Sequence, residues 1–529
     1  MTGRGRSVGL EAWRGLATAL YAASDSLVAR MTAGPVSAPR FTGLRQPLTY
    51  LDRGRPELAR DLYRGHFAFA GLVLDCSPND VFRVSAPSPA WTAELAGFAW
   101  LAHLEAAGFA LYRSFARAMV LAWADHGKNR DRHCDCTRLV SFARHAGFLL
   151  TGASAEFETR FLAIASREAR RLQGRRAPSD RERLRQSAAL LSAALAFRGG
   201  EALRAQALHS LATAVQAAIL SDGGPASRNP QDLLALLLDV IPLRDMLASQ
   251  RLAIPPPLAA SVDRALPMLR MLCHADGGLA FFQGADATCK AAVCAVLEHD
   301  SVAGQPLVHA PHSGYCRLAQ GAAAVIADCG PASACNSTLA FEFSDGPHRI
   351  VGNCGMPRHA KAAWREAAKS PAAHSTLDHY DASEGPEAEV TVTPKGMLLA
   401  ARCLHHQRDL YLAASGHDFR GEDRIVSFTS GFVLRFHLHP SVRAWQDRKG
   451  ANILLMLPNH AAWKFTARGG HVSLEDSLLL ATGKGPQDCQ QIVIRGEPQE
   501  ASRVNWAFKK LDRKSRSRRS AEISPRLPF

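Results

Sequence analysis

Residues 309–343, HAPHSGYCRLAQGAAAVIADCGPASACNSTLAFEF, mark the change in sequence pattern that decides the fold. From residue 9 to about residue 300, apolar residues recur at helical spacing, and alanine, leucine and arginine are abundant. From about residue 305 onward, short runs alternate between apolar and polar residues and are separated by glycine, proline and asparagine. The sequence therefore predicts a helical first part and a β-rich second part, with the boundary within residues 295–310.

The helical part divides into consecutive segments with short breaks. Arg198-Gly199-Gly200 is one such break, because a glycine pair ends a helix and starts a turn. The predicted helical segments are 93–117, which has one or two helices around Gly108, and 139–172, 181–197, 201–220, 231–248 and 257–273. Antiparallel helix pairs in succession predict hairpins stacked in a ring or solenoid.

The second part contains eleven short candidate strands. They are residues 322–327, 339–343, 349–352, 388–393, 398–403, 409–413, 424–428, 433–438, 452–456, 463–467 and 491–494. Strands of this length and spacing predict a β-sandwich or a related antiparallel stack.

The composition favours a globular protein with a polyanionic partner. With 529 residues the chain exceeds the size of one typical core, and 47% of its residues are hydrophobic. The net charge of +15 favours acidic glycans, nucleic acid or anionic lipid. Residues 509–519 hold seven positive residues and one negative residue, a run that is typical of a solvated, disordered end. No RNA-binding signature, zinc finger or P-loop accompanies it, so nucleic acid is a minor hypothesis.

Neither a metal nor a targeting segment is predicted. His133-Cys134-Asp135-Cys136 is the tightest group of metal-binding residue types, but a structural zinc site needs a second pair, and we expect none. Most of the twelve cysteines are expected to be free thiols. The amphipathic stretch at residues 10–27 is interrupted by charged residues, so we expect no cleavable signal, and no segment reaches the length of a membrane span.

Several segments together resemble bacterial heparinase II/III-like proteins. They are residues 222–230 (DGGPASRNP), 309–315 (HAPHSGY), 373–376 (AHST), 420–424 (RGEDR) and 435–440 (RFHLHP). The similarity covers roughly residues 45–508, and the order of the segments agrees with the helix-then-strand layout. The resemblance implies an α/α toroid at residues 45–300 after a helical extension at 1–44, a β-sandwich at 301–508 and a disordered basic tail at 509–529.

The resemblance also implies a polysaccharide lyase without a cofactor, which cleaves uronic-acid-containing chains by β-elimination. The reaction removes the proton on C5 and protonates the leaving oxygen on C4. It needs an amide or cation on the sugar carboxylate, and a base and an acid within hydrogen-bond reach. Histidine and tyrosine suit these proton transfers. The implied location is the cell envelope or periplasm, with the cytoplasm as the alternative because no signal is evident.

Six residues are candidates for such a site. We expect His374, Tyr315 and His312 to be catalytic. We expect Arg228, Asn229 and His309 to bind the substrate. Two structural interpretations stay open: Asn229 before a proline is also typical of a helix cap, and Tyr315 at a strand start is also typical of packing with a satisfied hydroxyl.

Two positions depart from the family pattern. Pro225 and Cys335 stand where proteins of this type often carry histidines, and neither residue replaces imidazole in proton transfer at neutral pH. Three hypotheses follow. The chain is a lyase with a rearranged catalytic set, or a binding module that holds acidic glycan without cleaving it, or an assembly protein whose basic tail docks on a membrane or nucleic acid.

Overall fold

The computed structural model describes residues 39–51, 54–126, 132–299, 305–358, 360–379, 385–428, 431–447, 452–483, 485–497 and 499–511. The predicted helical extension at 1–44 lies outside these residues, apart from 39–44, which contain the short strand β1 (Gly43–Leu44). The part of the predicted tail from residue 512 onward also lies outside them.

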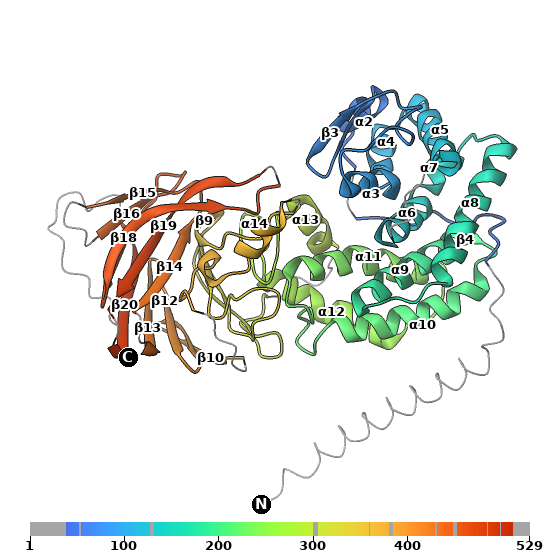
Figure 1. The fold of residues 1–529 in the computed structure, drawn as a ribbon. Coiled ribbons are helices and arrows are strands. Elements are labelled where there is room, and N and C mark those ends of the chain that lie inside the picture. Colours follow the sequence, from blue (N-terminus) through green and yellow to red (C-terminus); the bar gives the residue numbers. More distant parts are fainter. Residues whose placement is uncertain are drawn as a thin grey trace, which may run out of the picture.

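The first part of the chain is helical, as its spacing predicts, and Figure 1 shows it as a curved array of helices beside the sheets. The helices are α2 (Glu57–Tyr63), α3 (Pro89–Gly97), α4 (Leu101–Ala107), α5 (Ala110–His126), α6 (Arg132–Arg144), α7 (Ala146–Leu150), α8 (Ala155–Gln173), α9 (Asp180–Ala196), α10 (Glu201–Ala218), α11 (Pro230–Ser249), α12 (Pro256–Met271) and α13 (Lys290–Glu298). A small hairpin of β2 (His66–Phe69) with β3 (Leu72–Asp75) accompanies them, and β1 pairs with β4 (Phe197–Arg198) although the two are far apart in the chain.

The predicted break after residue 197 separates α9 from α10. Gly199 has φ +82°, and a Cβ there would lie 2.2 Å from the carbonyl oxygen of Arg40. Only glycine fits such a close approach in the left-handed region without strain. Gly108 likewise ends α4 in the left-handed conformation, and the segment 93–117, predicted as one or two helices around Gly108, contains parts of three, α3, α4 and α5.

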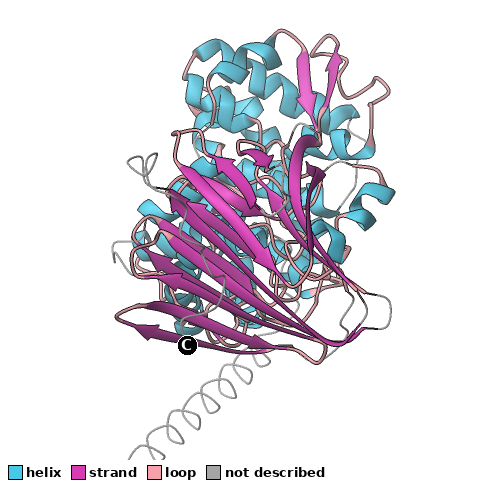
Figure 2. Cartoon of the chain, turned by 90° about the vertical axis from the view of Figure 1, so that its left-hand side faces the viewer, coloured by secondary structure: helices cyan, strands magenta, loops and turns pink. Residues whose placement is uncertain are grey.

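The second part contains two eight-stranded antiparallel sheets, which confirms the predicted mixed architecture of helices followed by strands (Figure 2). One sheet has the order β10 (Glu387–Thr393), β11 (Gly396–Arg402), β12 (His406–Ala413), β13 (Asp418–Phe428), β20 (Gln499–Leu511), β17 (Ala462–Arg468), β16 (Asn452–Met456) and β15 (Arg443–Gln446). The other has the order β18 (His471–Leu479), β19 (Gln487–Gly496), β14 (Phe432–Leu438), β9 (His348–Gly352), β8 (Phe341–Asp345), β7 (Ala323–Asp328), β6 (Tyr315–Gln320) and β5 (His309–Ala310). Helix α14 (Ala362–Ala367) and the 3-10 turn η1 (Pro371–Ala373) lie between β9 and β10 in the chain.

Aromatic side chains from both sheets fill the space between them. Phe343 of β8 lies 4.8 Å from Phe419 of β13, ring centroid to ring centroid, and Trp506 stacks on Phe341 at 5.4 Å. These residues occupy alternate positions of their strands, so the period of two places them on one face. Their burial joins the two sheets into a sandwich.

Five strands of the sandwich were not predicted, namely β5, β6, β15, β18 and β20. The basic tail was expected from residue 509, but β20 continues to Leu511, because Val504, Trp506 and Phe508 keep the inward alternation up to the basic run. Lys510 then forms an ion pair with Asp345 at 2.6 Å. Strand β18 was not predicted, since it lies at the edge of its sheet and carries polar residues such as Glu475 and Asp476.

Candidate functional site

The loop that precedes α11 is fixed to the loop that enters the β-sandwich. Asp222 accepts hydrogen bonds from the backbone N–H groups of His312 at 2.8 Å and Ser313 at 2.7 Å, and from the Ser313 hydroxyl at 3.0 Å. A single carboxylate therefore joins the two segments that carry most of the predicted site residues. We call this region, where the helical part meets the β-sandwich, the boundary.

Arg228 and Tyr315 come together at the boundary but point into the protein. Arg228 is 4% exposed, and its Nε donates to the carbonyl oxygen of Ser313 at 2.8 Å. The rest of its guanidinium donates to the carbonyl of Pro331 and to the carboxylate of Asp328. Tyr315 is 0% exposed and donates its hydroxyl to the carbonyl oxygen of Arg228. Burial and the charge of Asp328 raise the pKa of Tyr315 well above its usual value.

Asp328 is the centre of this buried network. Besides Arg228, its carboxylate accepts hydrogen bonds from Gln283 at 2.8 Å and from the Ser337 hydroxyl at 2.7 Å. The side-chain oxygen of Gln283 in turn accepts from the backbone N–H of Cys335 at 3.2 Å. Each buried polar atom named here has a partner, which is the arrangement expected of a structural network.

Cys335 and Pro225, the two departures from the family pattern, are both buried at the boundary. Burial, with the charge of Asp328, raises the pKa of the Cys335 thiol to about 11. A thiol with that pKa carries almost no thiolate at neutral pH, so it is a poor nucleophile and a poor base there.

His374 follows the turn η1 and is buried. The Ala368 carbonyl lies near its ring, but neither ring nitrogen makes a hydrogen bond of standard geometry with the described residues. Burial lowers the pKa of His374 to about 4, so the ring is neutral at pH 7. Among the described residues, no three histidine, cysteine or carboxylate side chains come close enough to share a metal ion.

The two remaining predicted histidines do not join Tyr315. His312 is exposed, and His309 is half-buried in β5, where it pairs with Cys316. Tyr315 pairs with Ala310 and lies in the interior. The structure thus brings Arg228 and Tyr315 together and leaves His312 at the surface.

Asn229 keeps both roles that the sequence left open. Its side-chain oxygen caps α11 by accepting from the backbone N–H of Gln231 at 2.9 Å, as expected of an N-cap. Its Nδ2 lies 3.7 Å from the position that a Cβ on Gly284 would take, and it has no hydrogen-bond partner in the described part of the chain. The amide is half-buried, so this donor is available to a ligand.

Arg358 is a residue beside this site that the sequence did not suggest. Its Nε donates to Asp286 at 2.7 Å, and Asp286 also accepts from the side chain of Gln231, two residues after Asn229. The guanidinium is 56% exposed, and the charge of Asp286 raises its pKa. Arg358 and Asp286 are 72 positions apart in the chain, so no local motif could have indicated the pair.

A second buried network fastens the last loop of the helical part to the sheet. His274 donates to the carboxylate of Glu342 at 2.9 Å and shares a hydrogen bond with the hydroxyl of Ser344 at 3.0 Å. Arg349 forms ion pairs with Glu342 and Asp276, both at 3.2 Å. These partners lower the pKa of Glu342, so it stays ionised. The predicted strand at 339–343 contained Glu342, but its pairing with the helical part was not foreseen.

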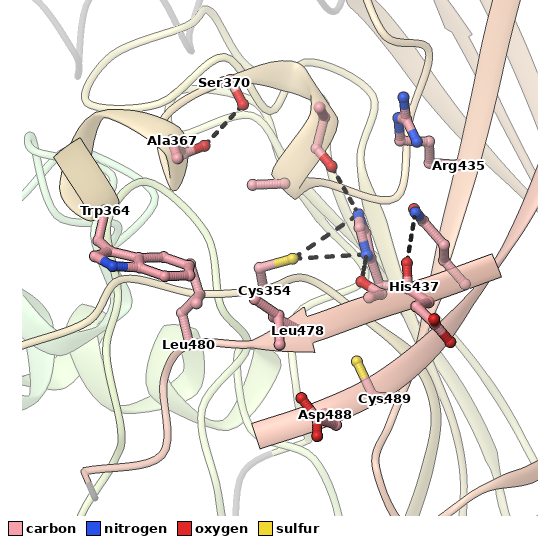
Figure 3. A pocket seen from close by; sticks show the side chains of 15 residues that line it. Cys354, Trp364, Ala367, Ser370, Arg435, His437, Leu478, Leu480, Asp488 and Cys489 are labelled. Carbon is pink, nitrogen blue, oxygen red and sulfur yellow. Dashed lines mark hydrogen bonds between the residues drawn. The ribbon is translucent and has the colours of Figure 1, made fainter. Parts of the chain in front are cut away.

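A cavity of about 700 Å³ lies in the β-sandwich region, between α14 and the strands β18 and β19 (Figure 3). His437 and Cys354 lie on its inner wall, and Trp364 of α14 lies at one side. His437 bonds to the Ser477 hydroxyl at 2.8 Å and to the Ala372 carbonyl at 3.0 Å. Of the predicted site residues, none lines this cavity.

Comparison with known proteins identifies the β-rich part. Residues 302–507 match the family model "Heparinase II/III-like, C-terminal". The fold of the whole chain agrees: a crystal structure of heparinase III has a TM-score of 0.73, with 13% identity and coverage of 96% of this chain and 92% of that chain. The β-rich part of this chain matches the heparinase II/III-like family. The resemblance stated from the sequence is confirmed.

Two further relatives differ in their described roles. Heparan sulfate lyase HepC from Pedobacter heparinus has a TM-score of 0.60 and 14% identity, over 96% of this chain and 91% of that chain. "FtsZ-localized protein C" from Caulobacter vibrioides is 28% identical over 494 residues, which cover 82% of this chain and 84% of the relative. This chain therefore resembles lyases in its fold and, in its sequence, a protein that is named for its localisation.

Two other findings concern membrane-spanning helices and Asp135, an acidic residue of α6. In the described part of the heparinase-like chain, no helix has the length and apolar character needed to cross a membrane. In α6, the carboxylate of Asp135 forms ion pairs with Arg138, Arg171 and Arg175, so it serves as a buried anion in the helical core.

Proposed function

We propose that this heparinase-like protein binds an acidic polysaccharide at the boundary without cleaving it. The observation that carries the proposal is the environment of Tyr315, whose hydroxyl is fully buried and already donated to the Arg228 carbonyl. A tyrosine can remove the C5 proton only if its pKa falls and a sugar reaches its oxygen. Here burial raises that pKa.

The other parts of an elimination site are also occupied or separate. The Arg228 guanidinium, which would neutralise the sugar carboxylate, is paired with Asp328. His374 is buried and neutral, and its position behind η1 keeps it from solvent. Only His312 is exposed, and one exposed histidine supplies no carboxylate neutralisation. β-Elimination therefore has weaker support than binding.

Binding has support from Asn229 and Arg358. The Nδ2 of Asn229 is a free donor within the described residues, and the Arg358 guanidinium is 56% exposed although it is paired with Asp286. Gln231 links the two residues, because it hydrogen-bonds to Asn229 and to Asp286. Amide and guanidinium donors are the groups that hold carboxylates and sulfates. The net charge of +15 adds a long-range attraction for such polymers. A location in the cell envelope, where polysaccharides are met, is part of this proposal.

The test separates cleavage from retention. The full chain is incubated with a panel of uronic-acid polymers, and near-ultraviolet absorbance reports any unsaturated product. We expect no absorbance rise and retention of at least one polymer on immobilised protein. A rise that is lost on Tyr315→Phe with the fold intact would overturn the proposal, and so would absence of retention for the whole panel.

Asn229→Asp tests the amide donor of the binding site while the helix cap is kept. Aspartate keeps the oxygen that caps α11 but replaces the free amide donor with a negative charge. We expect retention of the acidic polymer to fall by about tenfold or more, because a hydrogen bond to a charged group contributes about 1.5–3 kcal/mol. Ser154→Asp at the cap of α8 is the matched control, since it adds the same charge at another helix start. Arg358→Gln is expected to weaken retention, while Arg365→Gln on α14 is not.

A second candidate function rests on the Caulobacter relative. A protein named as FtsZ-localized is similar over most of both chains. We propose as the alternative that this chain is an assembly protein of a cell-division structure. A fluorescent fusion at the native locus would be concentrated at the division site under this alternative, and an even distribution would contradict it.

A further inference from the structure

The cavity beside α14 belongs to the β-sandwich region alone and has the size of a ligand site. Its volume of about 700 Å³ lies within the range of about 300–1,000 Å³ that is usual for small-molecule pockets. Cys354, Ala373 and Leu480 form a buried, mostly apolar inner surface. Figure 3 shows Trp364 and Leu480 on one side of the space and the strands that carry His437 and Cys489 on the other.

One polar atom in this cavity lacks a partner. Gln491 is 9% exposed, and it lies on β19 directly opposite His437 of β14. Its Nε2 donates to the backbone oxygen of Asp476 at 3.2 Å, while its Oε1 is buried and has no hydrogen bond with any described residue. A buried acceptor without a donor costs about 1–3 kcal/mol. A ligand in the cavity would recover this free energy if the Gln491 amide turned its Oε1 toward a donor of that ligand.

Two carboxylates give the cavity entrance a negative charge. Asp476 and Asp488 both line the cavity, and both are exposed. Neither forms an ion pair with another described residue, although the chain as a whole is strongly basic. An entrance of this sign attracts a cation and repels the acidic polymer proposed for the boundary.

The nearby basic groups do not cancel this charge. Arg435 is paired with Asp378 at 2.9 Å. Burial lowers the pKa of His437 to about 3, so its ring is neutral. A positively charged ligand therefore meets no uncompensated cation among the described residues that line the cavity.

The exposed indole of Trp364 suggests the shape of the ligand. It is 41% exposed and lies at the side of the cavity, on a helix that follows the β9 strand. An indole face offers a flat apolar surface to a ring and attracts an adjacent cation. The ligand should thus combine a ring, several hydrogen-bond donors and a positive charge.

We propose that this cavity is a second binding site, for an amino sugar that carries a free ammonium group. Its ring would pack on Trp364, a donor would reach the Oε1 of Gln491, and the ammonium would face Asp476 and Asp488. This site goes beyond the boundary proposal, because it uses other residues and prefers the opposite ligand charge. It would let the protein hold two differently charged stretches of a glycan.

The experiment compares short oligomers of glucosamine with N-acetylated oligomers of equal length, by calorimetry on the full chain. We expect binding of the free-amine oligomers and at least tenfold weaker binding after acetylation, because the acetyl group removes the charge. Gln491→Leu, Trp364→Ala and the double change Asp476→Asn with Asp488→Asn should each weaken binding about tenfold. Trp445→Ala, which removes another exposed tryptophan on β15, is the matched control and should leave binding unchanged.

Several outcomes would overturn this inference. These are no binding of glucosamine oligomers, equal binding of the acetylated oligomers, equal binding of an oligolysine peptide, or wild-type binding by the double aspartate variant. Gln491→Leu removes the unpaired Oε1 together with one hydrogen bond, from Nε2 to the backbone oxygen of Asp476, so thermal unfolding of this variant is measured beside wild type to show that the fold is intact. Retention of acidic polymer by these variants tests the boundary independently, so the two proposals fail separately.

Discussion

The boundary and the cavity both contain buried polar side chains, but they differ in how completely those side chains are paired. At the boundary, Asp328 accepts from Arg228, Gln283 and Ser337. In the cavity, the Oε1 of Gln491 has no donor, and Asp476 and Asp488 face outward without an ion pair in the described residues. A fully paired network contributes to folding, whereas unpaired groups beside an open space are available to a ligand. Of the predicted catalytic residues, Tyr315 lies in the paired network, whereas His312 is exposed and neither ring nitrogen of His374 has a hydrogen bond with a described residue.

The largest expected effect comes from opening the paired network. Asp328→Asn leaves the buried Arg228 guanidinium without its counter-charge, and breaking a buried ion pair in this way costs about 3–5 kcal/mol. We expect a correspondingly lower midpoint in urea unfolding. Asp378→Asn is the control: its partner Arg435 is half-exposed, so the loss should stay below about 1 kcal/mol. Equal losses of stability in the two variants would contradict the difference in pairing between the boundary and the cavity.

The pH dependence of stability compares a histidine from each region. His374 at the boundary and His437 in the cavity have folded pKa values of about 4 and about 3, below the ordinary 6.5. In that window the unfolded chain binds more protons, so stability falls as pH decreases from 6.5 toward the folded pKa. Each ring should cost about 1.4 kcal/mol per pH unit.

Urea unfolding at pH 7 and pH 5 measures this dependence while most carboxylates stay ionised. His374→Asn and His437→Gln should each reduce the difference in unfolding free energy between the two pH values. His437 retains hydrogen bonds to Ser477 and Ala372, so its replacement should cost more at pH 7 than that of the unpartnered His374. If neither variant changes the difference in unfolding free energy between pH 7 and pH 5, the two rings are not buried in the neutral form.

The smallest expected effect concerns the hydroxyl of Tyr315. Tyr315→Phe removes one buried hydrogen bond to the Arg228 carbonyl, which should cost about 1–2 kcal/mol and leave polysaccharide retention unchanged. Tyr411→Phe is a close match in the β-sandwich, because Tyr411 also donates to a backbone carbonyl, that of Lys395, at 2.7 Å. Similar losses of stability in both variants would show that the Tyr315 hydroxyl has a structural role. A loss of polysaccharide retention or cleavage in Tyr315→Phe alone would instead show that Tyr315 acts in the binding or catalytic site.

Much of the fold was predictable because it depends on local periodicity. Helical spacing up to about residue 300 and period-two alternation afterwards gave the order of the two parts, and Gly108 and Gly199 mark their breaks where expected. Strands β5, β6, β15, β18 and β20 were missed. Polar residues weaken the alternation of the edge strand β18, whereas β20 lies inside its sheet and runs into the basic residues that were taken as a tail. Edge strands bury only part of their surface, so their pattern is weaker.

The site was only partly predictable. Among its residues, Asn229 was found from its loop, and its capping role followed from the proline after it. Arg228 was found as well, but its direction was not, since a left-handed φ of +58° turns it toward Asp328, one hundred positions later in the chain. Nothing in the local sequence linked Trp364 to Gln491 or Arg358 to Asp286.

The sequence by itself determined the order of helices and strands, the basic charge and the heparinase II/III-like resemblance, because these depend on composition, short periods and local motifs. Only the tertiary structure decided which polar groups are hydrogen-bonded within the protein and which remain without a partner among the described residues. Tyr315 and Gln491 are both polar residues on buried strands, and their sequences give no sign of the difference. The partners that satisfy one and leave the other open are brought near by packing between distant segments, which no local pattern encodes.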